Sequence, residues 1–246
     1  MMGRLDNYVV TVNLIKLALT LAWTAVLFSC FGSTANAQWK DADLEWTLKR
    51  DRDGIQIFLT KVPGSKFRAI LSIMEVEAST GQLAALVMDL DNCPNWAAMC
   101  KSAEIIERIS ASECYVHSIN DAPFPVRDRD IVAHVQWFYD KANGKVSMRS
   151  DATPDRLPKR KGIVRVQYAS SEWHFTPLNN GMVLVENYAH VDPTGNVPAW
   201  LTNLLIVDSP YRTLKNMRKL ISTGAYSDAS VGFIPVDAHL GELESN

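Results

Sequence analysis

Short runs of β-branched and aromatic residues, separated by turn residues, recur along most of the chain. Two pairs of consecutive runs are joined by Asn143-Gly144 and Asn180-Gly181, a dipeptide that adopts the positive φ angles of tight hairpin turns. Successive hairpins predict a meander, and therefore an antiparallel sheet. The predicted strands cover residues 55–61, 67–77, 104–109, 115–119, 130–139, 145–150, 163–175 and 182–191.

Two segments have the apolar spacing of amphipathic helices. Ser79 and Gln82 form a capping box ahead of the first. The second covers residues 198–222, where Pro210 should kink or interrupt it. A short helix is also expected over residues 39–49. The apolar stripe of the long helix comprises Leu201, Leu204, Leu205, Tyr211, Leu214, Met217 and Ile221.

The first 37 residues resemble a signal peptide. An apolar stretch at residues 17–31 follows Lys16, and Ala35-Asn36-Ala37 forms the A-x-A pattern of a cleavage site. The stretch is shorter than the roughly 20 residues that span a bilayer. We therefore expect export, to the periplasm or out of the cell. A lipid-anchored Cys30 is the alternative, because residues 27–30 weakly resemble a lipoprotein box.

Cleavage after Ala37 would leave Cys93, Cys100 and Cys114. Disulfides persist in oxidising compartments, and Cys93 and Cys100 are close enough in sequence to pair. Spacing does not determine connectivity. Three buried free thiols are the equal alternative.

Residues 38–222 read as one domain, because no linker or internal repeat divides them. Residues 223–246 lack periodicity and are net acidic, which predicts a loose tail. The net charge is −2, and the densest basic cluster, residues 159–161, is typical of an exposed turn. Nucleic acid is therefore not an expected partner.

No nucleophile motif, phosphate-binding loop or metal-ligand spacing occurs in the sequence. The histidines are scattered, so no metal and no cofactor is expected. Asp128 and Asp130 alternate with Arg127 and Arg129, which favours charge pairing over a carboxylic acid with a raised pKa. The five histidines are His117, His134, His174, His190 and His239.

Several segments, in order, resemble the START (steroidogenic acute regulatory protein-related lipid-transfer) domain family over about residues 40–222. Pro123-Phe124-Pro125 through Arg129-Asp130-Ile131-Val132 is similar to its P-F/W-P-x-x-x-R-D-x-V signature. Further matches are Asp53-Gly54-Ile55, Asp91 with Trp96, residues 162–166, residues 173–177 and residues 192–201. Each match is weak alone, and the ordered combination is specific.

The resemblance implies an α+β helix-grip fold, in which a curved antiparallel sheet wraps a long C-terminal helix and encloses a tunnel for one apolar molecule. In such domains the R-D pair, here Arg129 and Asp130, begins a central strand. The D-P-x-G-x-x-P turn, here Asp192, Pro193, Gly195 and Pro198, aims the last helix across the tunnel. Both motifs are expected to be architectural rather than ligand-binding.

The register of the family also indicates which strand faces line the tunnel. Asn187 is the polar member of an otherwise apolar face, and it is either a satisfied core amide or a ligand contact. His134 is expected to point outward. The candidate cavity-lining residues are Val116, Ser118, Asn120, Ile131, Ala133, Val135, Trp137, Asn187, Leu201, Leu204 and Leu205.

Phosphatidylcholine-carrying members use an aromatic cage with charged partners, and Ser118, Ile131, Ala169, Cys93 and Ala97 stand at the matching positions. Choline lipids are therefore disfavoured. Sterol-carrying members place an arginine where this chain has Val135, so the expected ligand is apolar with few polar anchors.

The leading hypothesis is an exported, monomeric, non-enzymatic carrier that binds a sterol-like, phospholipid or fatty-acid-type lipid and contacts membranes transiently. The alternatives are a cyclase- or hydrolase-type enzyme of the same superfold and a lipid sensor.

Overall fold

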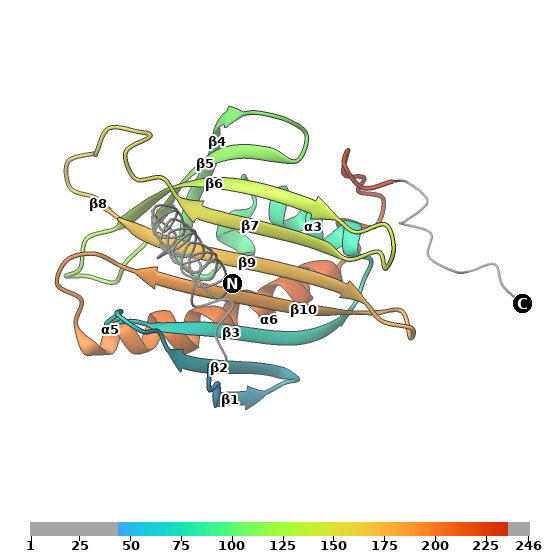
Figure 1. Cartoon of the computed structure of the whole chain (residues 1–246), viewed down its shortest axis with the longest axis horizontal. Coiled ribbons are helices and arrows are strands. Elements are labelled where there is room, and N and C mark those ends of the chain that lie inside the picture. Colours follow the sequence, from blue (N-terminus) through green and yellow to red (C-terminus); the bar gives the residue numbers. More distant parts are fainter. Residues whose placement is uncertain (1–43, 236–246) are drawn as a thin grey trace, which may run out of the picture. The chain divides into compact units, whose positions relative to one another are not determined.

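The computed structural model describes residues 44–235, and ten strands of this part of the chain form one sheet (Figure 1). Their order is β1-β2-β3-β10-β9-β7-β6-β5-β4, with antiparallel pairing throughout, and β8 adds a short parallel pairing to β6. The strands are β1 (Thr47–Arg52), β2 (Ile55–Lys61), β3 (Arg68–Glu77), β4 (Cys100–Arg108), β5 (Glu113–Asn120), β6 (Arg129–Tyr139), β7 (Val146–Ala152), β8 (Val164–Arg165), β9 (Tyr168–Pro177) and β10 (Met182–Asp192).

Both Asn-Gly dipeptides form the predicted hairpin turns, between β6 and β7 and between β9 and β10. Gly144 has a φ of 68° and Gly181 a φ of 76°, the left-handed region that glycine enters without a Cβ clash. The predicted strand at residues 163–175 is divided into β8 and β9. The antiparallel meander is confirmed.

Helices α3 (Thr80–Met88) and α4 (Cys93–Trp96) lie on one face of the sheet (Figure 1). The predicted capping box begins α3: Ser79 Oγ accepts the Gln82 N–H, and Gln82 Oε1 accepts the Ser79 N–H. This reciprocal pair satisfies two backbone donors that the first helical turn leaves free.

The C-terminal helix has three consecutive parts, α5 (Ala199–Asn203), a π-helical turn η1 (Leu204–Asp208) and α6 (Ser209–Ile221). The π-helical turn ends two residues before Pro210, and its closing bond runs from the Ser209 N–H to the Leu204 carbonyl. Proline has no N–H to continue an α-helical ladder, which accounts for the wider turn at this point. The predicted interruption is confirmed.

Helix α6 packs on the same face as α3 and α4 and contacts β2 and β3. Its buried stripe, Tyr211, Leu214, Met217 and Ile221, joins the main core. Tyr211 also donates to the Asp53 carboxylate and Arg218 to the Asp53 carbonyl, so α6 binds the turn between β1 and β2. A large antiparallel sheet holding a long C-terminal helix is the expected helix-grip fold.

Two expectations were wrong within the described residues. The segment expected as a helix at residues 39–49 enters strand β1 at Thr47. The segment 223–235 is not loose, because Tyr226, Val231 and Ile234 are buried in the core cluster. Apolar residues there are too few and too irregularly spaced to be recognised as core from sequence.

Further contacts hold this segment. Tyr226 donates to Asp89 and accepts from Asn92, and the Phe233 ring lies 5.8 Å from that of Trp137. The predictions of a signal peptide at residues 1–37, of an alternative anchor at Cys30 and of a loose tail beyond residue 235 concern residues outside the described part of the chain.

Candidate functional site

Two adjoining cavities lie between the sheet and the helices on its inner face. The first, of about 300 Å³, lies between strands β4 to β7 and β9 and the α3–α4 region. Its wall is largely apolar and includes three tryptophans, Trp96, Trp137 and Trp173. Trp96 and Trp173 meet edge to face with ring centroids 6.3 Å apart.

The second cavity, of about 410 Å³, lies beneath the beginning of the C-terminal helix. Leu201, Leu205 and Ile206 cover it from the helical side, and Phe67 and Ile70 line it from β3 and the preceding loop. Asn120, Ile131 and Val191 line both cavities. The two cavities therefore adjoin each other along the sheet and share this part of their wall.

Most of the predicted lining residues are brought together here. Strand alternation turns one face of β5 and one face of β6 toward the first cavity. These faces carry Val116, Ser118, Asn120, Ile131, Ala133, Val135 and Trp137. Leu201 and Leu205 line the second cavity, as the helical stripe predicted.

Asn187 and Leu204 line neither cavity. Asn187 lies opposite Trp173 in the β10–β9 ladder, and its amide nitrogen donates to Ser171 Oγ at 3.0 Å and to the Glu172 carbonyl at 3.2 Å. These bonds match the satisfied-amide alternative. Leu204 is half-buried at the start of the π-helical turn, whose wider winding rotates side chains away from the α-helical stripe.

The R-D pair has two different roles, because successive residues of β6 face opposite sides of the sheet. Arg129 lines the second cavity, so it is not purely architectural, contrary to the expectation from the motif. Asp130 faces the other side and accepts hydrogen bonds from Arg165 at 2.8 Å and His117 at 3.1 Å. Burial raises the pKa of Asp130, but these two hydrogen bonds outweigh it and lower the pKa below its ordinary value.

The expected charge pairing is present, but with distant partners. Asp128 binds Lys101 at 3.0 Å, and Asp130 binds Arg165 rather than either neighbouring arginine. His134 lies on the outward face of β6, as expected, where it contacts Glu113 at 2.7 Å and stacks on Tyr115. These pairs link neighbouring strands of the sheet, and of their members Glu113 also lines the first cavity.

The D-P-x-G-x-x-P turn connects β10 to α5. Asp192 Oδ1 accepts the Thr194 N–H at 2.8 Å, and Gly195 has a φ of 79°. Pro193 lines the second cavity, and the Pro198 carbonyl accepts the Leu201 N–H at the helix start. The turn thus sets the direction in which the helix enters over the cavity.

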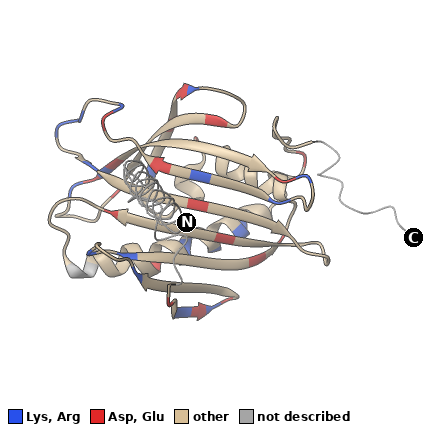
Figure 2. Cartoon of the chain, in the orientation of Figure 1, with Lys and Arg blue, Asp and Glu red and all other residues tan. Residues whose placement is uncertain are grey.

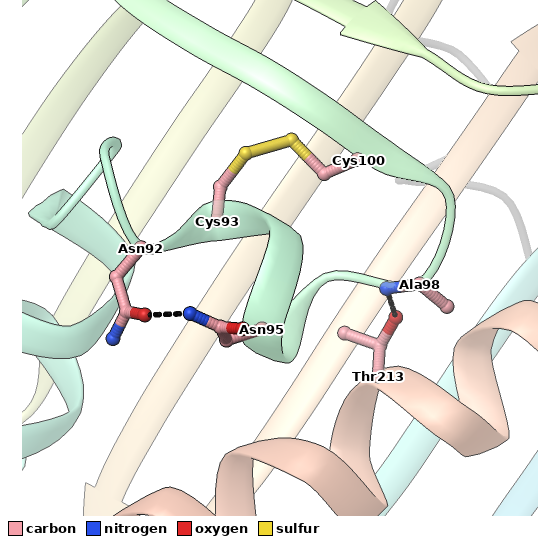
Figure 3. The surroundings of a disulfide bond; sticks show 6 residues. All are labelled: Asn92, Cys93, Asn95, Ala98, Cys100 and Thr213. Carbon is pink, nitrogen blue, oxygen red and sulfur yellow. Dashed lines mark hydrogen bonds between the residues drawn. A yellow bond between two sulfur atoms is a disulfide. The ribbon is translucent and has the colours of Figure 1, made fainter.

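A disulfide joins Cys93 in α4 to Cys100 at the start of β4, with the Cα atoms 5.9 Å apart (Figure 3). Both cysteines line the first cavity. In the same segment the Ala98 N–H donates to Thr213 Oγ1 of α6 at 3.0 Å, and Asn95 donates to Asn92. The bond from Ala98 to Thr213 ties the α4–β4 connection to the C-terminal helix, and the disulfide closes the connection on itself.

Cys114 is the free cysteine of the described chain and also lines the first cavity. Burial raises the pKa of its thiol, which favours the unreactive protonated form.

Charged groups show no concentration of one sign on the strands, where acidic and basic residues are interspersed (Figure 2). Between residues 44 and 235 no cluster of three His, Cys, Asp or Glu side chains is arranged to hold a metal ion. No helix in this same part of the chain is both long and apolar enough to cross a membrane.

The antiparallel sheet, the long C-terminal helix packed on it and the apolar cavities between them define a helix-grip protein. The model of the START domain matches residues 35–222, and the chain belongs to this family. The resemblance read from the motifs is confirmed.

Similar proteins come from bacteria and mammals. An uncharacterized protein of Pseudomonas aeruginosa is 32% identical over 198 residues, which are 80% of this chain and 95% of that protein. Human phosphatidylcholine transfer protein is 27% identical over 184 residues, covering 72% of this chain and 84% of its own length.

Solved structures show the same fold. A STAR-related lipid transfer protein from Xanthomonas axonopodis superposes with a TM-score of 0.66 at 30% identity, covering 72% of this chain and 98% of that one. Human StAR-related lipid transfer protein 5 superposes with a TM-score of 0.63 at 17% identity, covering 85% of this chain and 96% of that one.

Proposed function

We propose that this protein binds one lipid in the two adjoining cavities and transfers or sequesters it. The observation that carries the proposal is the mostly apolar space between the sheet and the helices on its inner face, with the α3–α4 region over the first cavity and the C-terminal helix over the second. Burying a hydrocarbon chain there gains about 0.8 kcal/mol per CH₂, so an apolar space of this kind needs few polar contacts to bind a lipid. The names of the human and Xanthomonas relatives, which are lipid transfer proteins, support this activity.

The cavity wall favours carriage over catalysis. An acid–base site needs paired titratable groups facing the substrate. The buried Asp130, Arg165 and His117 cluster lies on the opposite side of β6 from the cavity face, which carries Ile131 and Ala133. We therefore place this chain with the non-enzymatic carriers, and an enzyme of the helix-grip superfold is the second candidate.

Sterols, phospholipids and fatty-acid-type lipids are the ligand classes to test. No aromatic box for a choline group stands at Ser118, Ile131 and Ala169, which all line the first cavity, so choline lipids are disfavoured. The signal-peptide pattern of residues 1–37 supports export to the periplasm, where the carrier would act as a monomer that contacts membranes transiently. Movement of the C-terminal helix would open the cavity at the membrane.

Organic extraction of the purified protein followed by mass spectrometry identifies any co-purifying lipid, and a panel of lipids then measures binding. A carrier should retain lipid at about one molecule per chain and bind at least one class in the panel. Protein that carries no lipid and binds none in the panel contradicts the proposal.

A matched pair of variants links binding to the cavity. Ala133→Phe introduces a ring into the first cavity, whereas Phe138→Trp changes an exposed aromatic on the outward face of the same strand. Binding should fall at least tenfold in the first variant and stay unchanged in the second. Val116→Phe, in the neighbouring strand, repeats the test if Ala133→Phe does not fold.

A further inference from the structure

Three buried polar atoms in the wall of the second cavity have no hydrogen-bond partner among the described residues. They are the amide nitrogen of Asn120, Nε of Arg129 and the hydroxyl of Ser209. Buried polar groups in proteins are nearly always hydrogen-bonded, because an unmade bond costs the desolvation of the group. Three such groups in one cavity wall therefore indicate a polar ligand group between them.

The fold brings these three groups together from distant parts of the chain. Asn120 and Arg129 are direct cross-strand partners in the β5–β6 ladder, a position in which side chains on one face lie about 5 Å apart. Ser209 is the first residue of α6, directly after the π-helical turn, and covers the same cavity from the helical side.

The charged residues in the wall of the second cavity indicate the sign of the charge on its ligand. Three cations, Lys66, Arg68 and Arg129, line the second cavity, and no Asp or Glu belongs to its described lining. Lys66 and Arg68 are exposed, whereas Arg129 is buried. An excess of positive charge in a cavity wall attracts and retains an anion.

Arg129 differs in this respect from the other buried arginine of the region. Arg165 is neutralised by Asp130 at 2.8 Å. Arg129 Nη1 donates to the Arg127 carbonyl, and among residues 44–235 no carboxylate lies within 4.0 Å of its guanidinium nitrogens, although Asp128, which binds Lys101, attracts it from further away. Burying a cation without a counter-ion in contact raises the free energy of the folded protein, unless a bound anion pairs with the cation.

We propose that the second cavity is the head-group end of the lipid site and binds an anionic, hydrogen-bond-accepting head, a carboxylate or a phosphate monoester. Arg129 supplies the charge, Asn120 donates a second hydrogen bond, and Ser209 contributes its hydroxyl from the helix. The acyl chain extends past Asn120, Ile131 and Val191 into the apolar first cavity, since these residues line both spaces. This inference rests on the proposed lipid-binding function and names its ligand class.

The test compares ligands that differ only in the head. Calorimetry with the purified protein measures palmitate against 1-hexadecanol, and lysophosphatidic acid against monoacylglycerol of the same chain. The anionic member of at least one pair should bind about ten- to hundredfold more tightly, the range expected of charge-assisted hydrogen bonds. The pair that shows the larger difference identifies the head as carboxylate or phosphate.

Variants of the cavity residues test which side chains cause the preference for an anionic head group. Arg129→Met should weaken binding of the anionic ligand about ten- to hundredfold and binding of the neutral ligand less than about threefold. Arg149→Met, which removes an exposed cation from the outward part of β7, is the matched control and should leave both unchanged. If Arg129→Met does not fold, Asn120→Leu and Ser209→Ala repeat the comparison, each with a smaller loss on the anionic ligand.

Equal binding of anionic and neutral ligands by the unmodified protein would overturn this inference and leave the lipid-binding proposal intact. Equal weakening of both ligands by Arg129→Met would overturn it as well. Absence of binding for all four ligands, and for the wider lipid panel, would instead contradict lipid binding itself.

Discussion

The Asp130 carboxylate binds Nη2 of Arg165 across 2.8 Å, and both side chains are almost completely buried, at 1% and 2% exposure. The same arginine donates to the carbonyls of Pro154 and Leu157. One ion pair therefore holds the connection between β7 and β8 against the outer side of β6, opposite the face that forms the cavity.

Arg165→Met should destabilise the protein by about 3–5 kcal/mol, because it leaves the Asp130 charge buried without its main partner. Denaturant unfolding of the variant and the unmodified protein measures the difference. Arg149→Met removes an arginine from a half-exposed pair with Asp151 and should cost only about 0–1 kcal/mol. Equal losses of unfolding free energy in the two variants would show that burial of the Asp130–Arg165 pair does not determine its contribution to stability.

The stability contributed by Asp130 should depend on pH. Burial raises its pKa, but hydrogen bonds from Arg165 and His117 more than offset this, so the folded pKa lies below the unfolded one. Stability from a carboxylate with a lowered folded pKa is fully present above the unfolded pKa of about 4 and is lost as the pH falls through the folded pKa.

The difference in unfolding free energy between the unmodified protein and Asp130→Asn should therefore shrink as the pH falls from about 6 to about 3. Denaturant titrations at several pH values measure it. A difference that stays constant over this range would contradict the lowered pKa.

Reduction of the Cys93–Cys100 disulfide should lower the unfolding free energy by about 2.5 kcal/mol, the loop-closure value for a loop this short. The two cysteines are 7 positions apart. Thermal unfolding with and without a thiol reductant measures the effect, and Cys93→Ser with Cys100→Ser should reproduce it. Cys114→Ser is the control and should leave the response to reductant unchanged.

Ile234→Ala should destabilise the protein by about 2–5 kcal/mol, because it deletes a buried side chain from the core cluster. Ser230→Ala, at an exposed position of the same segment, should have almost no effect. Unfolding in urea compares the two. If Ile234→Ala is as stable as Ser230→Ala, the segment 223–235 does not contribute to the core.

Local patterns were sufficient for most of the secondary structure. Three features could be predicted directly from the sequence, because each depends on residues only a few positions apart. They are the Asn-Gly turns, the Ser79 capping box and the interruption at Pro210. Strand β1 was missed because its exposed, charged residues lack the alternation that marks a half-buried strand.

The cavity wall was partly predictable for the same reason. Once the inward face of β6 was chosen, alternation assigned Ile131, Ala133, Val135 and Trp137 together. Arg129 follows the same alternation and could have been assigned to the cavity. Its place in the R-D motif of the family favoured an architectural role instead. Asn187 lines neither cavity, because its amide bonds to Ser171 and Glu172 depend on the neighbouring strand.

By itself the sequence determined the antiparallel meander, the capped and interrupted helices and membership of the START family, because turn chemistry, periodicity and ordered motifs are local properties of the chain. Only the tertiary structure decided that Asp130 pairs with Arg165, that residues 223–235 complete the core, and that Asn120, Arg129 and Ser209 share one cavity. Those contacts join residues distant in sequence, and their energies depend on burial and distance, which no local pattern contains.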